Sequence, residues 1–437
     1  MLYRILKILI SIGMKLYYRK IIVKNQHILN EKGPKIILAN HPNTLIDAWM
    51  VGYISKEPIY YMAKGTFFNT RWKKKLLMSL GMIPINRSQD QSSKVVSNTD
   101  SFEKCYQILE QGKSLLIFPE GNSFSERLLR KLKSGSARIA LQTELRNDGQ
   151  LGLKIIPVGL VYVQPEKFRS AVYATVGEPI SPLAHLDLFK TDSLKAARLL
   201  TEEFREGLSK LLVGSESKEH ETLSEQIIQI LTSNYSDRVS KGVEADVNMI
   251  RKINNKVISI SKTNVDQLDE LKRLVYQINW QTEKLNVRAE FLDRNFRSNM
   301  FIRQIIQSIF GLVLGLPLFL WGMIHNAIPY YFTDWIIPKI VKDIEYYAPI
   351  AILLGLVIYP LNYLGFVYLG EILFDIRGWY KVIYFTTMPV TGMFAYYFYH
   401  YYKHISFKLS FTMQMNTEGD AIAQLKSDRE KLKEIVL

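Results

Sequence analysis

The chain has 437 residues, of which 48% are hydrophobic, and a formal net charge of +15. At about 100–200 residues per domain, this length predicts more than one domain. A basic surface suits nucleic acid or anionic lipid. Because no zinc-ligand spacing or aromatic and basic recognition module occurs, we expect no nucleic acid partner. Cys105 is the only cysteine, which excludes an intrachain disulfide and a cysteine metal cluster, and we expect no metal and no cofactor.

Residues 1–19 form the first expected element, an apolar stretch that carries Arg4, Lys7 and Lys15. This pattern is typical of a helix that lies in the membrane interface. A cleaved signal peptide is the alternative. No small residues suited to a cleavage site follow, and basic residues trail the apolar stretch, so an uncleaved interfacial helix is favoured.

Residues 20–190 alternate apolar strand runs with helical stretches, which predicts an α/β domain with a mixed or largely parallel sheet. We expect its helices over 44–55, 69–80, 97–112 and 127–146.

The strand run 35–39 ends just before His41 and Asp47. A neutral imidazole at a strand end can take a proton from a substrate hydroxyl. A carboxylate on its other nitrogen fixes the tautomer and stabilises the imidazolium that forms. This pair predicts a general base that needs no serine or cysteine nucleophile, although His41 as a plain turn residue fits the pattern equally well.

Three further apolar runs end or break at residues whose side chains are suited to binding or catalysis. Residues 81–85 lead into Asn86 and Arg87, and an arginine offers phosphate paired, charge-assisted hydrogen bonds. The run 114–118 breaks before Glu120 and Gly121, where the carboxylate suits acceptor hydroxyls or support of the His41 region. Pro157 interrupts the run 153–160. Taken singly, a solvated arginine, a turn glutamate and a core strand explain these segments as well.

In their order and spacing, these four segments resemble the four motifs of the glycerophospholipid acyltransferase superfamily, over roughly residues 20–185. The resemblance implies that His41 is the catalytic base and that Asp47 orients it. It also implies that Arg87 binds the phosphate of the acceptor, that Glu120 and Gly121 line the acceptor site, and that the segment with Pro157 shapes the acyl-donor region.

Two departures from the family pattern concern the first and third motifs. Five residues, rather than four, separate His41 from Asp47, which on one continuous helix would place the pair about 120° apart. The pair therefore requires a non-helical turn, which Pro42 favours. This variant resembles the branch of fungal-type enzymes that acylate glycerol-3-phosphate or dihydroxyacetone phosphate. Ser123 stands where arginine is usual, and Lys64 is among the basic residues that are candidates to replace that contact.

Beyond residue 190 the sequence predicts a helical accessory region over 191–300 and a transmembrane region over 301–403, followed by a cytosolic tail over 404–437. Apolar runs at 309–324, 347–369 and 379–402 are close to the ~20 residues that cross a bilayer. The first is broken by Gly315 and Pro317, and it either spans fully or turns back as a re-entrant hairpin. Because the tail and the catalytic domain are both expected in the cytosol, we favour two full spans plus the re-entrant segment. Basic residues in the tail favour a cytosolic end.

The sequence thus predicts an α/β acyltransferase domain, with a mixed sheet flanked by helices, joined to a helical region and a C-terminal α-helical transmembrane region. The expected reaction moves a fatty acyl group from acyl-CoA or acyl-carrier protein to a hydroxyl of glycerol-3-phosphate, dihydroxyacetone phosphate or lysophosphatidic acid. Membrane lipids are expected partners, and the catalytic domain is expected to face the cytosol, at the inner membrane in a bacterium. A lyso-aminolipid acceptor and a non-catalytic lipid-binding protein are the alternatives.

Overall fold

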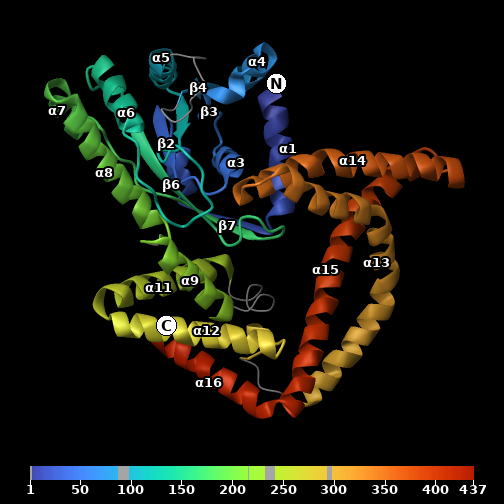
Figure 1. Ribbon diagram of the computed structural model, residues 1–437. Coiled ribbons are helices and arrows are strands. Elements are labelled where there is room, and N and C mark those ends of the chain that lie inside the picture. The colour runs from blue at the N-terminus through green and yellow to red at the C-terminus, as the bar shows by residue number, and fades with distance from the viewer. Residues whose placement is uncertain (1, 87–97, 215, 232–241, 293–297) are drawn as a thin grey trace. The chain divides into compact units, whose positions relative to one another are not determined.

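The computed structural model describes the chain except residues 1, 87–97, 215, 232–241 and 293–297 (Figure 1). The described residues form two compact units. The first comprises residues 1–218 and 343–352, and the second comprises residues 219–342 and 353–437.

The first unit is built on a seven-stranded sheet in the order β1-β7-β6-β2-β5-β3-β4. All neighbouring strands are parallel except β6 and β7, which are antiparallel, so the prediction of a mixed sheet is confirmed. The strands are β1 (Lys20–Lys24), β2 (Lys35–Ala39), β3 (Ile59–Lys64), β4 (Met82–Ile85), β5 (Ser114–Ile117), β6 (Lys154–Tyr162) and β7 (Ala171–Val176). Every residue of β2 and β5 is buried, as expected for apolar strands inside a parallel sheet.

Helices connect these strands and flank the sheet. They are α1 (Leu2–Tyr17), α2 (Gln26–Leu29), α3 (Thr44–Ile54), α4 (Arg71–Ser79), α5 (Asn98–Glu110), α6 (Gly135–Arg146), α7 (Leu186–Thr191) and α8 (Ser193–Leu211), with short 3-10 turns η1 (Gly65–Phe68), η2 (Leu183–His185) and η4 (Ile344–Tyr346). The helices expected over 44–55, 69–80 and 97–112 are present. The helix expected over 127–146 begins only at Gly135, because the Arg130 N–H is held in a loop by the Glu120 carboxylate.

Helix α8 packs on β6, and the first unit continues to Lys218. The contact is close because Gly159 of β6 has no side chain. A Cβ built on Gly159 would lie 2.6 Å from the Leu211 Cβ.

The second unit is helical. Its helices are α9 (Lys218–Leu231), α11 (Gly242–Thr263), α12 (Val265–Lys284), α13 (Ser298–Ile340), α14 (Tyr347–Phe374), α15 (Trp379–Thr417) and α16 (Gly419–Val436), with the 3-10 turn η3 (Ala289–Phe291). The first turns of α14, up to residue 352, are counted with the first unit. Among the described residues, two ranges are long and apolar enough to cross a membrane, Ile305–Ile340 and Ile344–Phe374.

The two ranges differ from the expected spans. The hairpin expected near Gly315 and Pro317 is wrong, because α13 continues through both residues as one helix. Neighbouring helices and local adjustments accommodate proline inside such apolar helices. The run at 379–402 lies in α15, which does not meet the same criterion of length and hydropathy.

His325 lies inside α13 and is only 3% exposed. Its Nε2 lies 2.9 Å from the Tyr384 hydroxyl of α15, and its backbone carbonyl accepts a hydrogen bond from the Asn362 side chain of α14. The neighbouring Asn326 accepts from Tyr363 of α14 and donates to the Met388 carbonyl of α15. Polar side chains thus join three apolar helices.

Candidate active site

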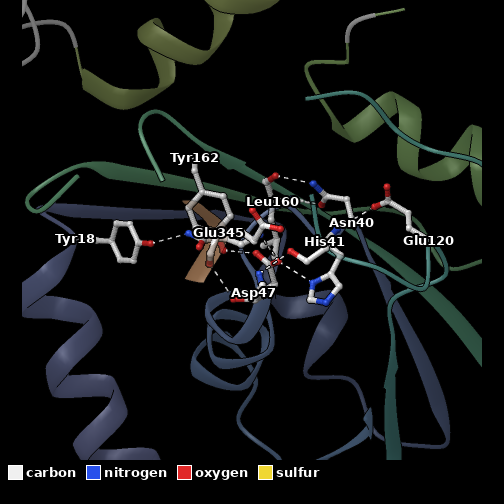
Figure 2. A network of polar contacts seen from close by, with 11 residues as sticks. Tyr18, Asn40, His41, Asp47, Glu120, Leu160, Tyr162 and Glu345 are labelled. Carbon is white, nitrogen blue, oxygen red and sulfur yellow. Dashed lines mark hydrogen bonds and ion pairs between the residues drawn. The ribbon is translucent and has the colours of Figure 1, made fainter. Parts of the chain in front are cut away.

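His41 and Asp47 are hydrogen-bonded, with 2.9 Å between His41 Nδ1 and Asp47 Oδ2 (Figure 2). Helix α3 begins at Thr44, so His41 precedes it and Asp47 lies in its first turn. Thr44 has a φ of 41°, in the left-handed region. The expected non-helical turn is therefore present, and it brings the two side chains together despite the additional residue between them.

Asp47 is fully buried and accepts hydrogen bonds from three donors. Besides His41, the Asn43 N–H lies 2.7 Å from Oδ2 and the Tyr162 hydroxyl 2.7 Å from Oδ1. Burial raises the pKa of Asp47, whereas the hydrogen bonds from His41, Tyr162 and Asn43 lower it. The donors are arranged to hold a carboxylate in a site that water does not reach.

The His41 ring is fixed on one face and one edge. It stacks on Phe118, with ring centroids 3.9 Å apart and planes inclined by 8°. Its side chain is 18% exposed. Within the part of the chain that the structure describes, no hydrogen bond to Nε2 is found, so this nitrogen is the one able to meet a ligand.

Glu120 supports the backbone on which His41 sits. Its Oε1 accepts from the His41 N–H at 3.0 Å, and its Oε2 accepts from the Arg130 N–H at 3.2 Å. Burial raises the pKa of Glu120, while these two backbone hydrogen bonds lower it. Of the two roles expected for this residue, the geometry fits support of the His41 region.

Asn40 extends the sheet beyond the end of β2. Its Oδ1 accepts from the Leu160 N–H at 2.7 Å and its Nδ2 donates to the Leu160 carbonyl at 2.9 Å. This pair of bonds fixes β6 two residues before Tyr162, whose hydroxyl reaches Asp47 (Figure 2). On the other side, the Asn43 side chain donates to the Tyr18 hydroxyl at 3.2 Å.

Sequence reasoning missed Asn40, Asn43, Tyr18 and Tyr162. Asn40 and Asn43 flank the His-Pro pair and offered a signal, because buried amides at a strand end satisfy backbone groups. Tyr162 offered none, since an aromatic residue at the end of an apolar strand is ordinary core composition.

Ser123 and Gly121 shape the loop that follows β5. The Ser123 hydroxyl accepts from the Thr44 N–H at 2.9 Å, and so links this loop to the start of α3. Gly121 has a φ of 80°, and a Cβ built there would lie 2.6 Å from Lys133 Nζ. A side chain at this position would therefore conflict with both the backbone conformation and the neighbouring amino group.

The remaining predicted site residues differ in where they lie relative to His41. Lys64 is the last residue of β3, and Asn86 follows β4. Because β2, β5, β3 and β4 are parallel neighbours, both residues lie at the carboxyl ends of these strands, as His41 and Glu120 do. Pro157 is buried in β6, and a Cβ built on Gly177 would lie 2.9 Å from its ring, so any influence of Pro157 on a substrate is indirect. Arg87 lies outside the described residues.

Among the described residues, no three of histidine, cysteine, aspartate and glutamate are grouped so as to hold a metal ion.

Comparison with known proteins shows what the segment that carries this site is similar to. An acyltransferase family model matches residues 20–161. Glycerol-3-phosphate O-acyltransferase 2 of Saccharomyces cerevisiae is 28% identical over 204 residues, 44% of this chain and 25% of that protein. The 1-acyl-sn-glycerol-3-phosphate acyltransferase of Borreliella burgdorferi is 28% identical over 151 residues, 35% of this chain and 55% of that protein. The crystal structure of the lysophosphatidic acid acyltransferase PlsC of Thermotoga maritima has 15% identity and a TM-score of 0.32, over 46% of this chain and 78% of that one.

The matched segment, with its mixed sheet flanked by helices, is an acyltransferase domain. These similarities and the sequence motifs support the glycerophospholipid acyltransferase superfamily for residues 20–161. The alignments span about a quarter of the yeast relative and about half of the Borreliella relative.

Proposed function

We propose that this protein is a membrane-bound O-acyltransferase that transfers a fatty acyl group from a thioester to a hydroxyl of a glycerol-phosphate acceptor. The observation that carries the proposal is the His41–Asp47 pair, in which Nδ1 is held by a buried carboxylate and Nε2 is left for a ligand. Such an arrangement is suited to general-base catalysis.

The Nδ1–H group of His41 is hydrogen-bonded to Asp47 and keeps its proton. Nε2 is then free to accept the proton of the acceptor hydroxyl. The acceptor oxygen then attacks the thioester carbonyl and forms a tetrahedral oxyanion. The oxyanion collapses, the carbon–sulfur bond breaks, and the proton on Nε2 passes to the leaving thiolate. Asp47 stays ionised and stabilises the imidazolium that exists between the two proton transfers.

The donor in this proposal is acyl-CoA or acyl-carrier protein. The acceptor is glycerol-3-phosphate, dihydroxyacetone phosphate or lysophosphatidic acid, in phospholipid biosynthesis. Arg87, Lys64 and Asn86 would meet the acceptor phosphate, with Glu120 and Gly121 shaping the same edge. The names of the yeast and Borreliella relatives support this acceptor class.

A membrane location, with the catalytic unit facing the cytosol, completes the proposal. Two helices with the length and hydropathy of membrane spans support it, together with the net charge of +15.

An acyl-transfer assay with labelled donor tests the reaction. Purified membranes that contain the full chain are offered glycerol-3-phosphate, dihydroxyacetone phosphate, lysophosphatidic acid and a phosphate-free lysolipid, and the products are identified. We expect His41→Ala to lower the rate by about 10²–10⁴-fold, the usual contribution of a general base. His27→Ala, at an exposed histidine of α2, is the matched control and should retain full activity.

Near-normal turnover in a folded His41→Ala protein would overturn the mechanism. Faster acylation of the phosphate-free lysolipid than of every phosphate-bearing acceptor would overturn the acceptor class.

A further inference from the structure

The first unit exposes apolar and basic side chains together on two helices. On α1, the exposed large hydrophobic residues are Leu2, Ile5, Ile8, Leu9, Ile12 and Leu16. The sequence predicts α1 to be interfacial, but α4 gives no such signal, since nine residues are too few to show a long amphipathic period. The structure nevertheless gives α4 the same surface character.

Helix α4 buries none of its residues. Trp72 is 65% exposed, and Leu76, one turn further on, is also exposed, as is Phe67 in the preceding turn η1. A tryptophan left in water on a helix without a buried face contributes nothing to the core of this unit. Aromatic rings of this kind are favoured at the boundary between water and lipid.

The charges on α4 have a single sign. Arg71, Lys73, Lys74 and Lys75 are basic, and no acidic residue occurs between Glu57 and Asp90. Lys73 Nζ lies 5.7 Å from the centre of the Trp72 ring. A partner that matches both the rings and the charges combines an apolar layer with anionic groups at its surface, which is the structure of an anionic bilayer.

Both helices are attached to the same end of β3. The Tyr3 hydroxyl of α1 accepts from the Ile59 N–H, at 3.4 Å. The turn after α4 reaches the same strand, where the Gly81 carbonyl accepts from the Tyr61 N–H at 2.9 Å. The amino-terminal end of α1 and the turn that follows α4 are therefore both held at the start of β3.

We propose that α4, with Phe67 and Trp72 inserted and its lysines at the headgroups, is a second membrane-contact helix, and that with α1 it seats the first unit on an anionic lipid surface. The contact begins at η1, directly after Lys64 at the edge of the candidate site. Amphiphilic substrates would thus enter and leave along the lipid surface. The contact does not depend on the proposed reaction.

Site-directed spin labelling of the full chain in lipid nanodiscs tests this contact. The background is Cys105→Ser, which removes the only cysteine, a buried one. Trp72→Cys and Ile8→Cys carry the nitroxide on α4 and α1, and Gln107→Cys, at an exposed position of α5, is the matched control. The readout is the accessibility of each label to oxygen, which concentrates in lipid, and to a water-soluble nickel chelate.

In discs with phosphatidylglycerol, we expect the ratio of oxygen to nickel accessibility at residues 72 and 8 to exceed that at residue 107 severalfold. Reversing Lys73, Lys74 and Lys75 to glutamate should lower the ratio at residue 72, and pure phosphatidylcholine discs should do the same. A label at residue 72 as accessible to nickel as the label at residue 107 would overturn the proposal. A lipid-embedded label indifferent to both the charge reversal and the headgroup would overturn the anionic assignment.

Discussion

Tyr162 is the side chain outside the His41–Asp47 pair that donates a hydrogen bond to Asp47. Its hydroxyl is one of three donors that lower the pKa of Asp47 against the effect of burial. Removing that donor raises the pKa of Asp47, so the carboxylate that orients His41 is protonated at a higher pH. We therefore expect Tyr162→Phe to shift the acid limb of the activity profile to higher pH and to lower the maximal rate.

The measurement is the rate of acyl transfer from pH 5 to 9. Tyr173→Phe, at a buried tyrosine of the neighbouring strand β7, is the control and should leave the profile in place. A Tyr162→Phe protein whose rate falls equally at every pH would show that the hydroxyl acts only on packing.

Glu120 predicts a pH dependence of stability with a definite sign. Burial raises its pKa in the folded protein, so between the ordinary carboxyl pKa and the raised one the folded state holds more protons than the unfolded chain. In that interval the free energy of unfolding falls as the pH rises. A tenfold difference in proton affinity between the folded and unfolded states corresponds to about 1.4 kcal/mol in the free energy of unfolding.

Glu120→Gln removes this titration. Thermal unfolding of both proteins from pH 4 to 7 should therefore show the stability of Glu120→Gln rising relative to the unsubstituted chain as the pH increases. A relative stability that falls with rising pH would mean that the backbone N–H groups of His41 and Arg130 outweigh burial.

At the scale of secondary structure elements, polar residues connect α13, α14 and α15. In the proposed membrane location they would take the place of the hydrophobic effect, which does not hold apolar helices together in lipid. Asn326 bonds to both other helices. Interhelical hydrogen bonds of this kind average about 0.6 kcal/mol each. We expect Asn326→Leu to lower the free energy of unfolding by about 1 kcal/mol, measured by detergent-induced unfolding.

Thr386→Val is the control, since this hydroxyl bonds only within α15. Equal stabilities of the Asn326→Leu and Thr386→Val proteins would show that the polar contacts between the helices are energetically neutral.

The same elements show which parts of the fold can be predicted from sequence. Strands such as β2 and helices such as α3 were predictable, because apolar runs and helical spacing carry local information. The continuity of α13 through Pro317 could not be predicted. A proline usually ends or kinks a helix in water, but it is tolerated among neighbouring apolar helices. The pairing of His41 with Asp47 was expected from the resemblance to the first family motif, with a non-helical turn to accommodate the additional residue. Tyr162, in contrast, reaches Asp47 from 115 residues away by sheet topology.

At the scale of the whole molecule, the two helices of spanning length found among the described residues predict an even number of crossings, with both chain ends on one side. Tags at residues 1 and 437 should be cleaved by protease only from the cytosolic face of sealed vesicles, with a marker of the opposite face as control. Cleavage of the C-terminal tag alone from the opposite face would establish an odd number of crossings.

The order of strands in the sheet also affects when the sheet can be completed during synthesis of the chain. Strand β1 pairs in parallel with β7, and about 150 residues separate Lys20 from its partner Ala171. At synthesis rates of roughly 5–20 residues per second, the first strand waits on the order of ten seconds for the strand that completes its edge of the sheet. Helix α1 precedes β1 in the chain, so it leaves the ribosome before that interval begins. Its apolar residues need no other part of the fold to be present. A nascent chain of this protein can therefore meet the bilayer before its catalytic fold exists.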